Sequence, residues 1–147
     1  MNDTMQISTI EVTRDFAAPP ERVFDAWLGK QWGAWLPPAT GQCDVVSIDP
    51  RVGGTYEVAM RFDSGREVTI NGEYLAIERP RRILMTWQGS YTPHPLKIEV
   101  LCEPIDGGTK LTLVQTGFVA DDMREGYRAG WTGPGGSFDK LAEQLRG

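Results

Sequence analysis

The chain has 147 residues, of which 40% are hydrophobic and 24% charged, so it is long enough to bury a core as one soluble domain over residues 1–147. Its formal net charge of −5 argues against nucleic-acid binding, which relies on clustered Lys and Arg. No apolar run approaches the roughly 20 residues of a membrane helix, and the N-terminal sequence MNDTMQIST lacks the basic start and apolar core of a signal peptide. We therefore expect a cytoplasmic protein without membrane insertion.

The N-terminal part of the chain predicts one strand and two short helices. Residues 8–16 alternate between apolar and polar side chains, which is typical of a half-buried strand. Pro20 fits the first turn of a helix, where its missing N–H has no partner to lose, and Gly29 ends that helical pattern. We expect a second short helix over residues 31–36, before Pro37 and Pro38.

From Thr40 the pattern changes to alternating runs that are separated by Gly, Pro and Asp turns. These runs predict six further strands, over residues 42–48, 55–62, 67–78, 82–89, 96–103 and 109–117. The strands do not alternate with long helices, which argues against a parallel α/β fold. The sequence therefore predicts an antiparallel sheet of seven strands.

The segment 121–145 is amphipathic with the spacing of one helical face. Its apolar residues are Met123, Tyr127, Trp131, Phe138, Leu141, Ala142 and Leu145. A proline inside a helix costs about 3 kcal/mol and each glycine about 1 kcal/mol, and the run 133–136 contains Pro134 and three glycines. We therefore predict a break in the helix at this run, with Ser137 placed to cap the resumed helix.

Several short motifs in a fixed order resemble a known family. They are DFAAPPERVFDAW, WGAWLPP, DPRVGGTYEVAM, NGEYLAIERPRRILMTWQG, GGTKLTLVQTGF and AGWTG. Together, from about Ile10 to Leu145, they resemble the bacterial relatives of the ATPase activator of the ninety-kilodalton heat-shock chaperone, within the START-like (SRPBCC, helix-grip) superfamily. The resemblance implies an α+β fold in which a curved seven-stranded antiparallel sheet wraps a long C-terminal helix, with two short helices after the first strand and an internal cavity. The run 133–136 is an insertion relative to the family pattern.

The two cysteines are predicted to be free thiols. The helix-grip order implied by the resemblance places three strands between those that carry Cys43 and Cys102. Neighbouring strands lie about 4.8 Å apart, whereas a disulfide requires Cα atoms within about 7 Å.

No set of residues in the sequence has the pattern of a catalytic or metal site. His94 is the single histidine and lies in the proline-bounded turn TPHP, which favours a solvated loop histidine over a catalytic base. The glycine pairs 53–54 and 107–108 lack the lysine or helix of a phosphate-binding loop and are expected to be turns. We therefore expect neither a cofactor nor a metal, and an enzymatic activity is less favoured than binding.

A curved sheet over a helix leaves a volume that side chains do not necessarily fill, particularly where Gly72, Gly126 and Gly130 contribute none. Ordinary core packing is the alternative for most residues that face this volume. The candidates for a ligand-binding cavity are Trp27, Trp35, Tyr56, Val58, Met60, Gly72, Tyr74, Met85, Trp87, Leu113, Gln115, Tyr127, Trp131 and Phe138. Trp131 is expected between helix and sheet, near Trp87 and Tyr56, beside a volume above ~300 Å³.

Three functions remain, in decreasing order of preference. The first is the binding of a small hydrophobic or amphipathic molecule, such as a lipid, in the cavity. The second, implied by the resemblance, is a protein-interaction module that co-regulates a chaperone ATPase. The third, also by resemblance, is a cavity enzyme of cyclase or hydrolase type. We expect a monomer or a homodimer, and fold alone does not decide between these functions.

Overall fold

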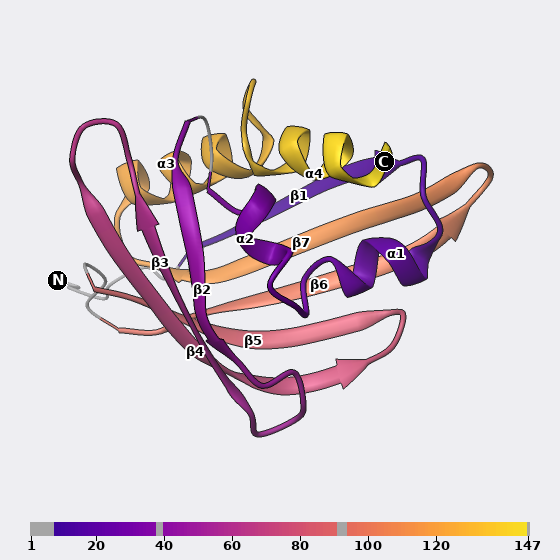
Figure 1. Ribbon diagram of the computed structural model, residues 1–147, viewed down its shortest axis with the longest axis horizontal. Helices are drawn as coiled ribbons and strands as arrows, with labels where there is room; N and C mark the ends of the chain where they lie inside the picture. The colour runs from indigo at the N-terminus through magenta and orange to yellow at the C-terminus, as the bar shows by residue number, and fades with distance from the viewer. Residues whose placement is uncertain (1–7, 38–39, 91–93, 147) are drawn as a thin grey trace, which may run out of the picture.

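The computed structural model describes residues 8–37, 40–90 and 94–146, and within these ranges the chain forms seven strands and four helices. In chain order the elements are β1 (Ser8–Phe16), α1 (Pro20–Asp25), α2 (Trp32–Trp35), β2 (Gln42–Ile48), β3 (Thr55–Arg61), β4 (Glu67–Glu78), β5 (Arg82–Gly89), β6 (Leu96–Ile105), β7 (Gly108–Phe118), α3 (Asp121–Thr132) and α4 (Ser137–Arg146) (Figure 1). The predicted elements are confirmed, with strand ends shifted by one or two residues.

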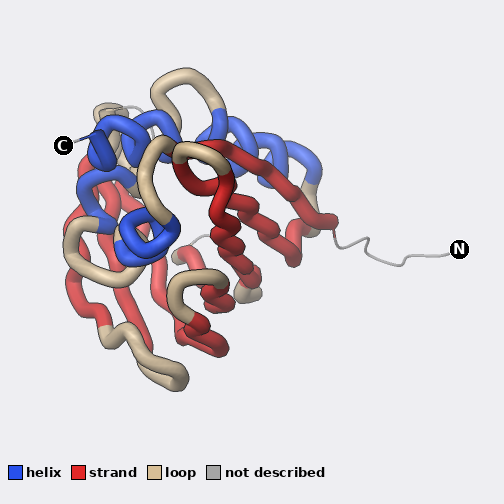
Figure 2. Tube along the Cα trace, turned by 90° about the vertical axis from the view of Figure 1, so that its right-hand side faces the viewer, coloured by secondary structure: helices blue, strands red, loops and turns tan. Residues whose placement is uncertain are grey.

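The strands form one antiparallel sheet in the order β1-β7-β6-β5-β4-β3-β2. The first strand pairs with the last, so that Ile10 lies opposite Gln115, and the remaining pairs join strands consecutive in sequence. The sheet curves beneath the helices, as the end-on view shows (Figure 2). The predicted curved sheet and its two short helices after the first strand are therefore confirmed.

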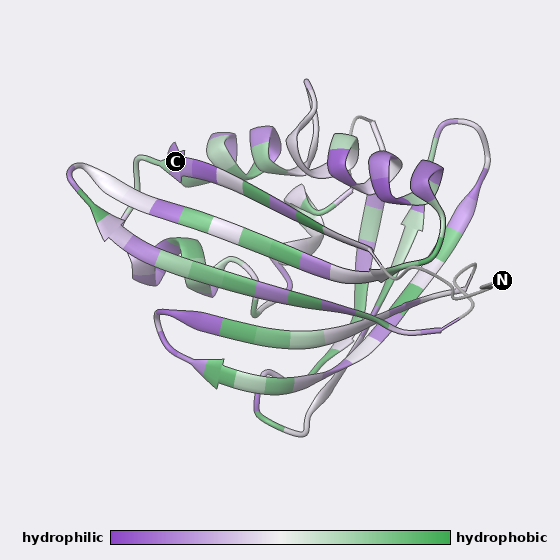
Figure 3. Ribbon diagram, turned by 180° about the vertical axis from the view of Figure 1, so that it is seen from behind, coloured by the Kyte–Doolittle hydropathy of each residue, from purple (hydrophilic) through white to green (hydrophobic). Residues whose placement is uncertain are grey.

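The core lies between the concave side of the sheet and the helices. Along β5, Ile83, Met85 and Trp87 are buried while the residues between them are partly exposed, which is the period of two expected for a strand. The same alternation appears as bands of hydropathy along the strands (Figure 3). The segment that contains α1 and α2 adds three fully buried indoles, those of Trp27, Trp32 and Trp35. These rings fill much of the space under the curved sheet.

The C-terminal helix is interrupted at residues 133–136, as predicted. α3 and α4 follow one another along one line, with a protruding loop between them (Figure 1). Gly135 has a φ of 71°, a conformation that residues with a side chain rarely adopt. A Cβ atom at Gly136 would lie 2.7 Å from the carbonyl oxygen of Gly130, so this position also requires glycine.

The prediction that Ser137 caps α4 is wrong. Its hydroxyl donates a hydrogen bond to the carbonyl oxygen of Leu36, at 2.5 Å, because the segment after α2 packs against the start of α4. Asp139 instead provides a hydrogen-bond acceptor for the loop before α4, since its carboxylate accepts a hydrogen bond from the backbone N–H of Gly135 at 2.9 Å.

Both cysteines are free, which confirms the prediction. Cys43 lies on β2 and Cys102 on β6, with β5, β4 and β3 between them. Burial raises the pKa of the Cys43 thiol to about 11, with a smaller contribution from Asp44, and burial raises the pKa of Cys102 to about 12. Neither thiol is therefore activated as a nucleophile near neutral pH.

Within the described ranges, none of the helices has the length and apolar character needed to cross a membrane.

Candidate functional site

A pocket of about 670 Å³ lies between α3 and the facing strands β3, β4 and β5. α3 and the residue before it form one wall, and the β3–β4 hairpin with one residue of β5 forms the other, while Leu36 at the end of α2 and Ser137 of α4 complete the lining. The lining residues are Leu36, Met60, Phe62, Arg66, Val68, Trp87, Ala120, Asp122, Met123, Gly126, Tyr127, Gly130, Trp131 and Ser137. The volume is within the range of small-molecule sites.

The α3 wall follows from helical spacing. Met123, Tyr127 and Trp131 are four residues apart and therefore lie along one face of the helix, with Gly126 and Gly130 on the same side. A Cβ atom added at Gly126 would meet no atom within 4 Å. The glycines thus widen the pocket by leaving out side chains, and the aromatic and thioether groups give its wall an apolar surface.

Two indoles form the inner part of the pocket, and each is held by a hydrogen bond. Trp131 donates from Nε1 to Oε1 of Gln115 at 2.9 Å, and Trp87 donates from Nε1 to the phenol oxygen of Tyr127 at 3.0 Å. Their ring centroids are 6.1 Å apart. Because these bonds join α3 to β7 and β5, they fix the helix over the sheet and satisfy both indole N–H groups.

Two charged side chains also line the pocket. Arg66 comes from the tight β3–β4 hairpin, and Asp122 comes from the first turn of α3. The carboxylate of Asp122 accepts a hydrogen bond from the backbone N–H of Met123 at 2.9 Å. A mostly apolar wall with a few polar groups suits a molecule that has both an apolar body and a polar end.

The structure separates the fourteen sequence candidates into two groups. Four of them line the pocket, namely Met60, Trp87, Tyr127 and Trp131. The other ten lie outside the pocket wall: Trp27, Trp35, Tyr56, Val58, Gly72, Tyr74, Met85, Leu113, Gln115 and Phe138. Close packing of β4 against β5 requires glycine at position 72, since a Cβ atom there would lie 2.0 Å from the carbonyl oxygen of Thr86. Ligand binding by any of the fourteen stays a prediction.

Of the two neighbours that were predicted for Trp131, the structure places one, Trp87, beside it. Trp131 lies beside Trp87, as predicted, whereas the Tyr56 ring contacts Tyr74 and Trp32 with centroids at 5.5 and 5.1 Å. Trp32, which the sequence candidates omitted, also contacts Trp87, at 6.3 Å. Trp32 thus links Tyr56 to the pocket-lining Trp87, and neither Trp32 nor Tyr56 lines the pocket.

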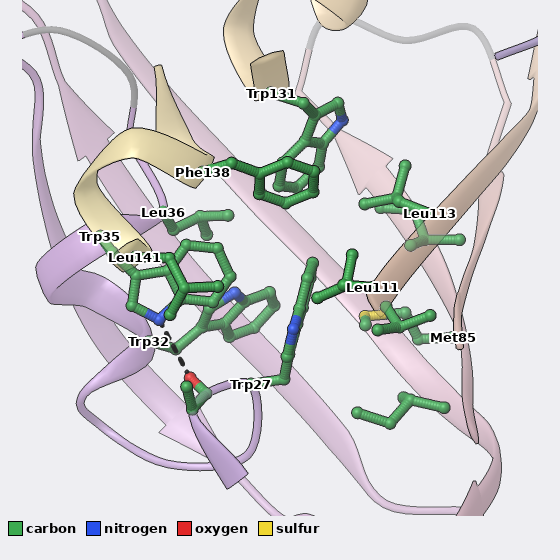
Figure 4. Close-up of a cluster of buried hydrophobic side chains, with 14 of the residues drawn as sticks. Trp27, Trp32, Trp35, Leu36, Met85, Leu111, Leu113, Trp131, Phe138 and Leu141 are labelled. Atoms are coloured by element: carbon green, nitrogen blue, oxygen red, sulfur yellow. Dashed lines mark hydrogen bonds between the residues drawn. The ribbon is translucent and has the colours of Figure 1, made fainter. Parts of the chain in front are cut away.

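Behind the pocket lies a cluster of buried rings (Figure 4). The Trp27 ring contacts those of Trp32, Trp35 and Trp131, at 6.2, 4.8 and 5.8 Å between centroids. Trp35 donates from Nε1 to the carbonyl oxygen of Ala26 at 3.1 Å, as the dashed line in the figure marks. For the candidates Trp27 and Trp35, this cluster matches ordinary core packing, which was the alternative to ligand binding.

The described part of the chain contains no group of three or more His, Cys, Asp or Glu residues that could hold a metal ion. His94 is hydrogen-bonded through Nε2 to the carbonyl oxygen of Gly117 at 3.1 Å and does not line the pocket. Burial raises the pKa of Tyr56 and of Tyr74, so both phenols are neutral near pH 7. Among the described residues that line the pocket there is no histidine or cysteine.

Comparisons with known proteins agree on one relationship. The family model described as Activator of Hsp90 ATPase homolog 1-like protein matches residues 17–145. The crystal structure of a protein from Chromobacterium violaceum is similar with a TM-score of 0.87 and 31% identity, over 95% of this chain and 97% of that chain. The crystal structure of the AHSA1 protein from Silicibacter pomeroyi is similar with a TM-score of 0.80 and 24% identity, over 95% and 98%. A solution structure from Staphylococcus epidermidis shows the same fold, with a TM-score of 0.80 and 21% identity over 99% and 94%. No curated protein matches significantly.

Proposed function

The chain belongs to the family of Activator of Hsp90 ATPase homolog 1-like proteins, and we propose that it binds a small hydrophobic or amphipathic molecule in the pocket between α3 and strands β3 to β5. The observation that carries the proposal is the pocket itself. It has a volume of about 670 Å³, and apolar side chains from two walls face each other across it.

The polar groups of the pocket support an amphipathic ligand. Arg66 and Asp122 are the charged lining residues, and Tyr127 adds a phenol that already accepts a hydrogen bond from Trp87. The apolar part of a ligand would lie against Met60, Met123 and the two indoles. Its polar end would lie toward the charged groups.

The test uses a substitution that fills the pocket without disturbing the core. Gly126 lines the pocket, is exposed and has open space where a Cβ atom would be, so Gly126→Leu should place its side chain in the pocket volume. Leucine is also a better helix former than glycine by nearly 1 kcal/mol, so the variant should fold at least as stably as the wild type. Loss of binding then cannot be attributed to unfolding.

Fatty acids, sterols, flavonoids and aromatic polyketides would be screened by scanning calorimetry. A ligand that binds only the folded protein stabilises it by about 2.7 kcal/mol at a hundredfold excess over its dissociation constant. We expect at least one class to raise the melting temperature of the wild type and to leave that of Gly126→Leu unchanged.

Ala129→Leu is the matched control, because Ala129 is exposed on α3 and does not line the pocket. This variant should respond to the ligand as the wild type does. No thermal shift of the wild type with any of the four classes would contradict the proposal. That result would favour a protein-interaction role, such as the chaperone co-regulation that the family description names.

A further inference from the structure

Four buried polar atoms have no hydrogen-bond partner among the described residues. They are Nε1 of Trp27, Nε1 of Trp32, the hydroxyl of Tyr74 and Nε2 of Gln115, and each of these residues is 0% exposed. An unpaired buried donor costs about 1–3 kcal/mol, and native proteins contain few of them. A group of four within one small core therefore requires an explanation.

Three of these atoms lie one side chain behind the pocket. Gln115 is bonded to the pocket-lining Trp131, the Trp27 ring contacts that of Trp131 at 5.8 Å, and the Trp32 ring contacts that of pocket-lining Trp87 at 6.3 Å. Figure 4 shows Trp27 next to Trp32 beneath Trp131. Tyr74 lies farther away, beyond Tyr56. We call Trp27, Trp32 and Gln115 the inner donors.

The inner donors share one chemical property, which is that their unpaired atoms can only donate. An indole N–H has no acceptor capacity. While Trp131 is in place, Oε1 of Gln115 faces its N–H group and Nε2 therefore faces elsewhere. Each of them is satisfied by an oxygen that accepts hydrogen bonds, and one carbonyl oxygen, with two lone pairs, can accept from two donors at most.

We propose that the pocket selects ligands that carry an acceptor oxygen, such as a ketone, quinone or carboxyl oxygen, which enters behind Trp131 and accepts hydrogen bonds from one or two of the inner donors. This inference rests on the proposed function of the pocket. Entry requires the Trp131 indole to turn away from Gln115. This movement breaks the hydrogen bond from Trp131 to Gln115 and the ring contacts of Trp131 with Trp27 and Phe138, and the bound ligand has to compensate for them.

Two probe molecules of nearly the same shape isolate the acceptor oxygen. 2-Acetylnaphthalene carries a carbonyl group where 2-isopropenylnaphthalene carries a CH₂ group of similar size. Calorimetric titration of the full chain should give a dissociation constant at least roughly tenfold lower for the ketone, since the donors are already desolvated and only the ketone pairs with them. The ¹³C resonance of the labelled carbonyl should also move downfield on binding, as it does when a carbonyl accepts a hydrogen bond.

Trp32→Phe and Trp35→Phe form a matched pair for these titrations. Both residues belong to α2 and are 0% exposed, but Trp35 already donates to Ala26 whereas Trp32 has no partner among the described residues. The preference for the ketone should fall in Trp32→Phe and stay in Trp35→Phe. Gln115→Met serves as a second donor deletion if Trp32→Phe does not fold.

The possible results distinguish a failure of this inference from a failure of the pocket proposal. Equal affinity of the wild type for both probes, or a carbonyl resonance that does not move, would overturn this inference and leave the pocket proposal standing. The same holds if the ketone preference persists in the donor deletions. If neither probe nor any of the four screened classes binds, the pocket proposal fails and this inference fails with it.

Discussion

The two C-terminal helices lie along one line over the sheet, but they are attached to it in different ways. α4 has 10 residues and buries Ser137, Phe138, Leu141 and Leu145, whereas α3 has 12 residues and buries Trp131. α4 packs against α2 and β1, and α3 packs against β1 and β7. The same sequence pattern therefore produces one helix of the core and one helix of the surface.

Polar contacts follow the same division. In α4, the hydroxyl of Ser137 and the ammonium of Lys140 donate to the carbonyl oxygens of Leu36 and Pro37, and Asp139 pairs with Arg14 of β1. The ion pairs of α3 join residues of α3 itself, as between Arg128 and Glu125. Its side-chain links to the sheet are the two indole hydrogen bonds, from Trp131 to Gln115 and from Trp87 to Tyr127. Regions with few buried contacts open at low free energy cost. We infer that α4 is the more firmly held of the two helices and that α3, where its indole hydrogen bonds break, is the wall of the pocket that opens first.

The largest expected effect comes from truncating the buried face of α4. Phe138→Ala should lower the free energy of unfolding by about 3–5 kcal/mol, because Phe138 is fully buried against Phe16 and Trp131. Met123→Ala on α3 should cost less than about 1 kcal/mol, since Met123 is only partly buried. Urea denaturation followed by circular dichroism measures both values. Similar losses in the two variants would remove the distinction between the helices.

Two glycine substitutions should change stability in opposite directions. Gly135→Ala places a side chain at a φ of 71° in the loop before α4 and should destabilise by roughly 1–2 kcal/mol. Gly126→Ala lies inside α3 with free space around it and should stabilise by up to about 1 kcal/mol. Melting temperatures of both variants test the signs. A destabilising Gly126→Ala would mean that the pocket side of α3 is more tightly packed than its geometry indicates.

The smallest effect is a pH dependence that distinguishes Asp139 from Glu125. The hydrogen bond from Arg14, and then that from Gly135, lower the pKa of Asp139. A lowered folded-state pKa adds stability that is present above about pH 5 and is lost as pH falls through that pKa. Asp139→Asn should therefore flatten the acid side of the global stability curve.

Glu125 provides the comparison, because Arg124 and then Arg128 lower its pKa within α3 itself. By the same linkage Glu125→Gln should also flatten the acid side of the global curve, but by less than Asp139→Asn does, and it should alter hydrogen exchange mainly in α3 amides. A larger global effect for Glu125→Gln than for Asp139→Asn would reverse the assignment of the two helices.

Local chemistry made the helices and strands predictable, and the family resemblance supplied the curved arrangement of the sheet around the C-terminal helix. Alternation defined the strands, and Pro134 with its glycines located the break, because these are properties of the residues themselves. The cap at Ser137 could not be predicted in the same way. Its hydroxyl bonds to Leu36, which lies more than a hundred residues earlier, and such competition is invisible in a local pattern.

The site was predictable where it follows helical or strand period, as for Tyr127, Trp131 and Trp87. The β3–β4 hairpin contributes Phe62, Arg66 and Val68, and its position over the pocket depends on the curl of the whole sheet. No spacing in the sequence encodes that curl. Tyr56 was expected beside Trp131 from strand period alone, but its ring packs against Trp32, which the sequence candidates omitted.

All five tryptophans of the chain belong to one connected set of rings. Trp27 contacts Trp32, Trp35 and Trp131, and Trp87 contacts Trp32 and Trp131, with centroids 4.8–6.3 Å apart. At such separations an excited indole passes its energy to its neighbours faster than it emits light. The intrinsic fluorescence of the protein is then shared by all five indoles. A molecule that quenches Trp87 at the pocket therefore also quenches the emission that follows absorption by Trp35, on the far side of the cluster.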